Sequence, residues 1–192
     1  MSGVRNKTEL LLLLLYASDG PTSSPSAAPI VGITRLEKLL FLAKLEQSFL
    51  HDAPYEQDFH FVPFKMGPWT QEVYDEVDFL ESLGLLAKEQ RGELSVEDEA
   101  HNDELFSDLV LDKYQKSSIA LDETTDAFQL TSEGRKKAAE IWGRLSLEER
   151  QKLMALKRRF NNMSLKQLLR YVYNKYPEYT SASEIKEYLN IR

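Results

Sequence analysis

The sequence predicts a mostly α-helical α+β protein with a small antiparallel β wing, and three observations lead to this class. Apolar residues recur at three- and four-residue spacing along most of the 192-residue chain, as in helices with one buried face. Only Phe59–Phe64 and Phe128–Leu130 have a strand-like pattern, with a further extended stretch at Leu85–Ala87. Hydrophobic residues make up 42% of the chain, which is enough for an ordinary core.

The first predicted helix is Lys7–Ala17, which contains the six-leucine run Leu10–Leu15. A helix that is apolar on nearly all faces belongs inside a core. A membrane-spanning helix needs about 20 apolar residues, and no cleavage site directly follows the run, so we expect neither a transmembrane segment nor a signal peptide. Ser18–Pro29 is rich in proline and serine and predicts a loop.

A second helix is predicted at Ile33–Leu50. Thr34 and Glu37 have the spacing of an N-terminal capping box at its start. The apolar residues of this segment recur as one buried face. These residues are Leu36, Leu39, Leu40, Ala43 and Phe49.

A third helix is predicted at Trp69–Leu83, with Gly84 as its C-cap. Before it, Pro63 keeps the strand-like segment out of the middle of a sheet, and Met66-Gly67-Pro68 predicts a turn. His60 is expected to be an exposed strand residue.

The C-terminal third is predicted to be helical because helix-starting residues precede each apolar-periodic segment. Glu149 has the capping-box position relative to Ser146. The predicted helices are Ser132–Leu145, Ser146–Arg159, Ser164–Tyr173 and Glu184–Leu189, with Thr131, Ser146 and Ser183 as caps.

Three helices, two extended segments and a Leu-Thr-x-x-Gly sequence leading into a fourth helix follow the order of a winged helix. Leu83-Gly84-Leu85-Leu86 would lead into the first wing strand, and Phe128–Gly134 would supply the return strand and the next helix. We therefore expect a winged-helix-like domain at residues 1–145, with an acidic insertion at about 89–126, and a basic helical extension at residues 146–192. A generic helical bundle is the alternative.

Three motifs lie within residues 33–87. They are a helix motif, an aromatic segment that ends in Gly-Pro, and a tyrosine in the next helix: Arg35-Leu36-Glu37-Lys38-Leu39-Leu40-Phe41-Leu42, Phe61-Val62-Pro63-Phe64-Lys65-Met66-Gly67-Pro68 and Tyr74. In this combination the chain resembles the SocA-like or Panacea antitoxin domain and the related YwgA-type proteins of bacteria and archaea. The resemblance implies binding, because members neutralise toxins or act as adaptors, and it transfers no catalytic residue.

The expected partner surface lies around the Gly-Pro motif. Tryptophan, tyrosine and methionine are favoured anchors of protein interfaces. The alternative is that Trp69 simply closes the core. The partner would be another protein, such as a toxin or a defence-system component, and a homodimer through a terminal helix is also open. The expected partner-binding residues are Lys65, Met66, Gly67, Pro68, Trp69 and Tyr74.

Charge is distributed unevenly along the chain, whose net charge is −7. Residues 131–192 carry 14 basic and 7 acidic side chains, a net +7, whereas residues 1–90 carry a net −6 and residues 91–130 a net −8. One interpretation is that the basic segment packs on the acidic body. The other is that it binds a polyanion or an acidic partner.

The alternative function is a nucleic-acid-associated regulator or defence-system accessory that uses the basic C-terminal helices. Basic side chains interleaved with tyrosines can bind phosphates and stack bases. A solvated helix face is the simpler interpretation of the same pattern. The candidate nucleic-acid residues are Arg150, Lys152, Lys157, Arg158, Arg159, Lys166 and Arg170.

Major-groove reading by the third helix is not expected. Its positions predicted to be exposed carry carboxylates and no cation, which a phosphate backbone repels. These positions are Glu72, Asp75, Glu76, Asp78 and Glu81.

Catalysis, cofactors and metals are not expected. His51, His60 and His101 are separated, and none has a second ligand one helical turn away. The chain has no cysteine, which excludes disulfides and thiolate zinc sites and fits the reducing cytoplasm, where we expect the protein to act.

The acidic insertion is expected to contain a mobile loop at residues 93–102 and an amphipathic helix at about Asp103–Lys116. Phe106, Leu109 and Val110 would pack this helix on the body. Its acidic face would then cover the basic C-terminal helices.

Overall fold

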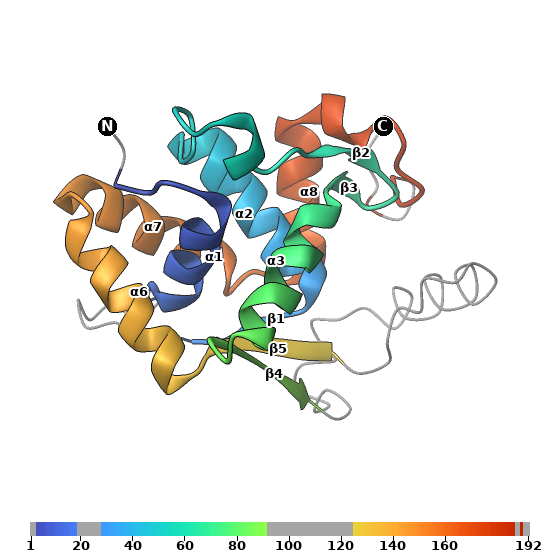
Figure 1. Cartoon of the computed structure of the whole chain (residues 1–192). Helices are drawn as coiled ribbons and strands as arrows, with labels where there is room; N and C mark the ends of the chain where they lie inside the picture. The colour runs from blue at the N-terminus through green and yellow to red at the C-terminus, as the bar shows by residue number, and fades with distance from the viewer. Residues whose placement is uncertain (1–2, 19–27, 92–124, 187–188, 190–192) are drawn as a thin grey trace.

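The computed structural model describes residues 3–18, 28–91, 125–186 and 189. Within them the fold is mostly α-helical with two small antiparallel sheets, which confirms the predicted fold class (Figure 1). Residues 19–27 of the loop predicted at Ser18–Pro29, the loop predicted at 93–102 and the helix predicted at 103–116 lie outside the described residues. In chain order the elements are α1 (Lys7–Tyr16), β1 (Ile30–Val31), α2 (Ile33–Gln47), η1 (Tyr55–Gln57), β2 (Val62–Phe64), β3 (Gly67–Trp69), α3 (Gln71–Ser82), β4 (Leu86–Arg91), β5 (Thr125–Leu130), α6 (Ser132–Arg144), α7 (Leu147–Phe160), α8 (Leu165–Lys175) and η2 (Pro177–Thr180).

The three-stranded sheet has the strand order β1-β5-β4, with both pairs antiparallel. Ile30 lies opposite Phe128, and Leu86 lies opposite Leu130. Strand β1 comes between α1 and α2 in the chain, and β4 and β5 follow α3. The succession α1, α2, α3, β4, β5 and α6 is the order expected for a winged-helix-like core, whereas β1 is a strand that the sequence analysis did not predict.

Helix α1 lies inside the fold, as its leucine run predicts. Leu10–Leu15 are all buried, and α1 contacts α2, α3, α6, α7 and β5 (Figure 1). Neighbouring elements surround the helix on several sides, as expected for a helix that is apolar on nearly all faces. In the described part of the chain, every helix is too short or too polar to span a membrane.

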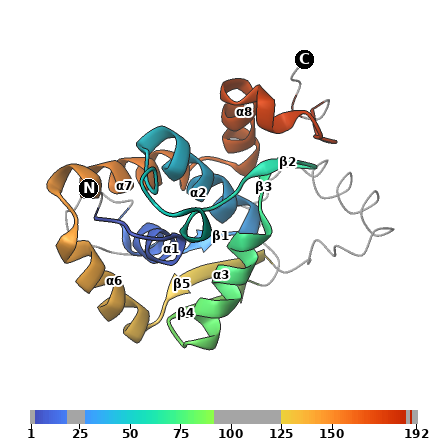
Figure 2. The ribbon, with the colours of Figure 1, turned by 45° about the horizontal axis from the view of Figure 1, so that its top comes forward.

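Helices α7 and α8 both pack on α2, and Figure 2 shows α7 running beside α2. Leu153, Leu156 and Phe160 of α7 and Leu168 and Val172 of α8 are buried in the same apolar cluster as the N-terminal helices. The helices of the expected C-terminal extension therefore share one core with the elements before them.

A tight corner joins the end of α3 to the start of α6. Gly84 has a positive φ of 68°, and Leu85 N–H donates to Leu80 O at 2.9 Å, which closes α3 as predicted. Thr131 caps α6 by accepting from Gly134 N–H, and its hydroxyl donates to Gly84 O at 2.7 Å. Both ends of the corner are thus tied to one threonine.

Gly134 is required at this corner because the backbone of Leu85 lies directly against it. A Cβ atom at position 134 would lie 1.9 Å from Leu85 O. The Leu-Thr-x-x-Gly sequence therefore combines a cap at Thr131 with a close backbone approach at Gly134.

Two predictions about helix starts are wrong. Helix α2 has no capping box, because Gly32 is its N-cap and Glu37 is buried and bonded to Thr70. Helix α3 begins at Gln71, because Trp69 belongs to β3 and Thr70 is the N-cap.

Other predicted boundaries agree with the structure more closely. The predicted capping box of α7 at Ser146 and Glu149 is formed, and α8 has a capping box at Ser164 and Gln167 that was not predicted. The helix predicted at Glu184–Leu189 is wrong for the described residues. Glu184–Lys186 are not helical, although Leu189 N–H donates to Ile185 O.

We predict that Gly134→Ala strongly destabilises the protein, because the new methyl group would clash with the Leu85 carbonyl. The expected loss is about 3 kcal/mol or more in the free energy of unfolding, measured by chemical denaturation. Gly143→Ala is the matched control in the same helix, because a Cβ there meets nothing within 4 Å. It should leave stability unchanged or raise it by about 0.5–1 kcal/mol. Equal effects of the two substitutions would contradict the close contact between Gly134 and the Leu85 carbonyl.

Candidate interaction site

Strands β2 and β3 form a hairpin that holds most of the expected partner surface. Their register places Pro63 opposite Pro68. Neither proline has an N–H group, so this pair takes a position in the ladder where no hydrogen bond is exchanged. The structure corrects the predicted turn at Met66-Gly67-Pro68, because Gly67 and Pro68 belong to β3 and Lys65-Met66 connects the strands.

Gly67 allows helix α8 to lie against the hairpin. Its φ is 86°, and a Cβ atom there would lie 2.9 Å from a ring carbon of Tyr173. Tyr173 is buried, and burial raises the pKa of its phenol to about 12. The hairpin backbone and an aromatic ring of the C-terminal part of the chain are therefore in direct contact.

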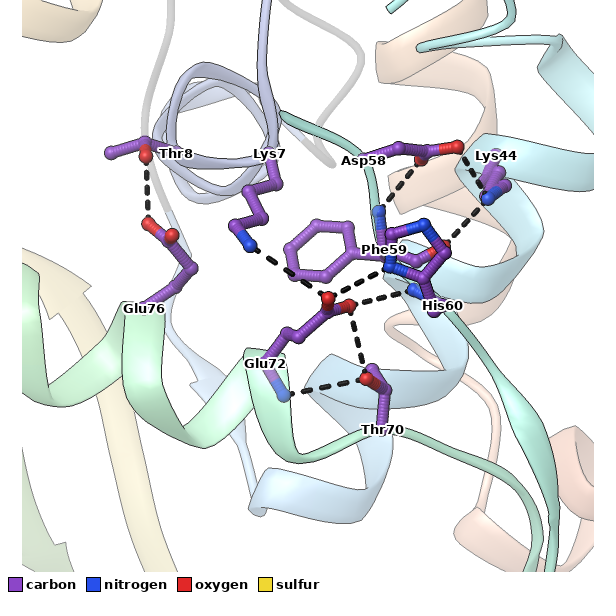
Figure 3. Close-up of polar contacts among 9 residues, drawn as sticks. All are labelled: Lys7, Thr8, Lys44, Asp58, Phe59, His60, Thr70, Glu72 and Glu76. Carbon is purple, nitrogen blue, oxygen red and sulfur yellow. Dashed lines mark hydrogen bonds and ion pairs between the residues drawn. The ribbon is translucent and has the colours of Figure 1, made fainter. Parts of the chain in front are cut away.

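Glu72 clamps the two ends of the hairpin together (Figure 3). One carboxylate oxygen accepts from the His60 backbone N–H at 2.6 Å and from the Thr70 hydroxyl at 3.1 Å. The other lies 2.8 Å from His60 Nδ1 and 3.8 Å from Lys7 Nζ. His60 precedes β2 and Thr70 follows β3, so one side chain fixes both stems and joins them to α1.

The charge of Glu72 is stabilised by these contacts. Partial burial acts to raise its pKa, but the hydrogen bonds from the His60 ring and backbone and the Lys7 charge outweigh it and hold the pKa below its usual value. The His60 ring stacks on Tyr55 with ring centroids 3.7 Å apart. The prediction that His60 is an exposed strand residue is wrong, since it is half-buried and lies just before β2.

Lys44 of α2 holds the stem that leads into the hairpin (Figure 3). Its Nζ donates at 2.6 Å to both the Asp58 carboxylate and the Phe59 carbonyl. Phe59 itself is fully buried and packs against Phe61. The segment before β2 is thus fixed by an ion pair on one side and by the core on the other.

A buried ion pair in α2 holds the stem that leaves the hairpin. Lys38 Nζ donates to the Glu37 carboxylate at 2.6 Å and to Pro68 O at 2.7 Å. Glu37 accepts from Thr70 N–H at 3.1 Å. Burial raises the pKa of Glu37, while Lys38 acts in the opposite direction. Two adjacent charges inside the otherwise apolar stretch Leu36–Ala43 were the sequence signal for this pair.

The motifs that carry the family resemblance meet at this pair. Lys38 of the helix motif bonds the carbonyl of Pro68 in the Gly-Pro motif. Tyr74 lies close enough to Glu37 for the carboxylate to act together with burial, and the pKa of Tyr74 rises to about 12. Arg35 instead reaches α7, where it donates to the carbonyls of Phe160 and Met163.

The six expected partner-binding residues divide into a half-buried group and a buried group. Gly67 and Pro68 are buried and contribute backbone, so they are removed from the expected surface. Lys65, Met66, Trp69 and Tyr74 are half-buried. Trp69 packs between Phe64 and Tyr74, with ring centroids 5.0 and 6.5 Å away.

Two residues that the sequence analysis missed extend this surface. Val62 is 47% exposed, and Pro63 is exposed beside it. Val62 lies opposite Trp69 in the hairpin register. Successive side chains of a strand point to opposite faces, so alternation accounts for Val62 beside Trp69 and does not account for the exposure of Pro63.

The basic C-terminal residues do not form one free surface. Lys157 is fully buried and donates to Leu15 O in the last turn of α1 at 2.9 Å, so it is removed from the expected nucleic-acid site. Arg150 donates to the carbonyls of Trp142 and Gly143 at the end of α6. Cations are favoured at these helix ends because the unpaired carbonyls there are partially negative.

The remaining candidate nucleic-acid residues differ in burial and in the groups that they contact. Arg170 is half-buried and donates to Leu189 O at 3.0 Å, and Lys152 pairs with Glu148 within α7. Arg158 and Arg159 are exposed, and Arg159 lies 4.8 Å from the ring centre of Tyr171. Lys166 is half-buried.

Ion pairs also connect the basic part of the chain to the acidic body. Arg144 donates to Glu9 at 2.6 Å, and Lys175 donates to Glu46 at 2.8 Å. Glu46 accepts from the Tyr171 hydroxyl as well, at 2.7 Å. These contacts support the interpretation in which the two charged parts pack on each other.

The exposed face of α3 carries fewer carboxylates than predicted. Glu72 and Glu76 are half-buried, and Glu76 accepts from the Thr8 hydroxyl at 2.7 Å (Figure 3). Asp78 and Glu81 remain exposed and pair with Lys88 of β4. Among the described residues, no group of three or more histidine, aspartate or glutamate side chains is arranged to hold a metal ion.

The chain matches no family model, no curated protein and no solved structure in the comparisons made.

We predict that Glu72→Gln lowers the free energy of unfolding at pH 7 by about 1–3 kcal/mol, because it removes a charged acceptor shared by both stems. Because the folded state depresses the pKa of Glu72 below 4.5, this stabilisation is present above that pH and is lost as the pH falls through the folded value. The difference in melting temperature between wild type and variant should therefore shrink below about pH 4.

Asp75→Asn is the matched control for this prediction. Asp75 lies on the same helix, is exposed and contacts Gln71. It should change the melting temperature by less than about 1–2 °C. A Glu72→Gln variant that is as stable as this control at pH 7 would show that Glu72 does not clamp the hairpin.

Proposed function

We propose that the protein is a non-enzymatic interaction module that binds a partner protein through its β2–β3 hairpin. The observation that carries this proposal is the combination of an anchored backbone and an apolar outer surface. Glu72, Lys44 and the Glu37–Lys38 pair hold the stems. Trp69 and the exposed Val62 lie between those stems and the tip.

A surface of this kind suits protein recognition for two physical reasons. A backbone fixed before binding loses little conformational freedom in the complex, so more of the contact energy contributes to affinity. Tryptophan and tyrosine at the centre of a patch are the side chains that most often dominate binding energy. The resemblance to SocA-like antitoxins supports the same function, with a toxin or a defence-system component as the partner and the cytoplasm as the place of action.

The second candidate function is nucleic-acid binding by the C-terminal helices. The observation that favours it is the pair of exposed arginines at the end of α7, with Arg159 beside the Tyr171 ring. Lys157, Arg150 and Arg170 each bond a backbone carbonyl, so the cationic surface is smaller than the sequence suggested.

We predict that Trp69→Ala weakens partner binding by about tenfold or more, because it removes the largest side chain of the proposed surface. The measurement is affinity purification of the tagged full-length chain, followed by titration of whatever protein co-purifies. Leu147→Ser is the matched control, because Leu147 is a 70% exposed apolar residue at the start of α7.

The melting temperature separates the two interpretations of Trp69. Lost binding with a folded variant supports the surface, and partner binding that survives in folded Trp69→Ala contradicts the proposal. Loss of binding in Leu147→Ser as well would show that the effect is not specific to the hairpin.

We predict that the double variant Arg158→Glu, Arg159→Glu has lower retention on heparin than the wild type only if the C-terminal helices bind nucleic acid. Nucleic-acid binding through phosphates weakens steeply with salt and would be lost in this variant. Retention at low salt that is equal in the variant and the wild type, or absent in both, would exclude the α7 end as a nucleic-acid site.

A further inference from the structure

The C-terminal segment of the chain lies on the hairpin. The η2 turn, which follows α8, contacts both β2 and β3, and Figure 1 shows the described chain after α8 beside these strands. Beyond η2, Glu184 N–H donates to Lys65 O at the hairpin tip at 3.0 Å. The segment thus uses a backbone hydrogen bond to the same turn that connects β2 and β3.

Side chains on both partners reinforce this contact. Lys65 Nζ lies 3.6 Å from the Glu184 carboxylate, and the Tyr173 hydroxyl lies 2.7 Å from Ser183 Oγ. Arg170 of α8 donates to Leu189 O at 3.0 Å. The hairpin tip and one face of α8 therefore form a surface with a cation at one end, a phenol in the middle and a guanidinium at the other end.

Two aliphatic side chains anchor the segment. Ile185 is 6% exposed and Leu189 is 1% exposed. They are four residues apart in the sequence, and Leu189 N–H donates to Ile185 O at 3.0 Å. The pattern that this surface accepts is an acidic residue, an aliphatic residue directly after it, and a second aliphatic residue four positions later.

The contacts of this segment are of a kind that another peptide can replace. The Lys65–Glu184 pair is partly exposed on both sides, and exposed pairs contribute little net stability. The main specific contacts go to backbone atoms of the segment, which every peptide has. Its detachment would leave Tyr173 and Gly67 in contact with each other, because that contact does not involve residues 183–189.

We propose that the hairpin tip and α8 form a peptide-docking site for an acidic–aliphatic segment of the partner protein, and that Ser183, Glu184, Ile185 and Leu189 occupy this site in the free chain. This inference rests on the proposed function and names the chemistry of the partner. Lys65 selects an acidic residue, and the positions of Ile185 and Leu189 select two aliphatic residues. A covalently attached segment competes at high effective concentration, so it would keep the site closed to weak ligands.

The test uses a fluorescent peptide with the sequence of residues 181–192 and the full-length chain, with binding measured by fluorescence anisotropy. In the variant Ile185→Asp, Leu189→Asp the attached segment loses its anchors. The free peptide should therefore bind this variant about tenfold more tightly, or tighter still, than it binds the wild-type chain. Equal binding to wild type and folded variant, or no binding to either, would overturn the proposal.

A second arm does not depend on the fold tolerating that double substitution. Full-length Glu184→Lys places a like charge beside Lys65 and keeps Ile185 and Leu189, and it should bind the wild-type peptide more tightly than the wild-type chain does. The Lys65→Glu protein, which keeps Glu184, should bind a peptide with Glu184→Lys more tightly than it binds the wild-type peptide. Failure of this charge exchange would overturn the assignment of Lys65.

Other occupants give distinct results. If wild-type chains form a dimer in light scattering that is absent in the Ile185→Asp, Leu189→Asp variant, a second copy occupies the site and the partner assignment is overturned. If the peptide binds as expected but Trp69→Ala does not affect the co-purified protein, the docking site stands and the proposed partner function fails.

Discussion

The buried pair of Glu37 and Lys38 is the interaction on which the rest of the hairpin depends. Both side chains are almost inaccessible to water, so neither charge is tolerable without the other. Removing one member of such a pair costs about 3–5 kcal/mol, because the remaining charge stays buried. The pair has spare hydrogen-bonding capacity, and the chain uses it on Pro68 O and Thr70 N–H. The two buried charges therefore obtain hydrogen bonds from the backbone of Pro68 in β3 and of Thr70 after it, and these bonds fix the hairpin against α2.

A related principle explains where the basic residues go. Arg35, Arg150 and Lys157 each bond carbonyls at or just after the end of a helix, in α7, α6 and α1 respectively. Each of these contacts joins two separate elements, because the cation comes from a different helix than the carbonyl. Part of the positive charge in the C-terminal third thus serves packing between helices. The charge imbalance along the sequence does not translate directly into a basic surface.

Most helices and the two strands β4 and β5 were predictable from local patterns, because caps, glycines and apolar spacing act within a few residues, whereas β1 and the non-helical Glu184–Lys186 were not. Ser146 with Glu149 and Thr131 with Gly134 are examples in which short-range chemistry determined the outcome. The site was less predictable. The spacing of Glu37 from Thr34 predicts a capping box, but Glu37 instead pairs with Lys38 and accepts from Thr70 N–H, 33 positions away in the chain. Long-range pairing of this kind leaves only an indirect signal, such as two charges inside an apolar run.

The ladder between β4 and β5 has a consequence for the connection between the two strands. The two strands are paired from Leu86 and Leu130 out to Arg91 and Thr125, so the ends of the connecting segment, residues 92–124, are held next to each other by the sheet. The entropy of closing a loop between fixed ends rises only with the logarithm of its length, by about 0.6 kcal/mol for each doubling. The paired ends of β4 and β5 therefore make the entropic cost of closing this connection depend only weakly on its length.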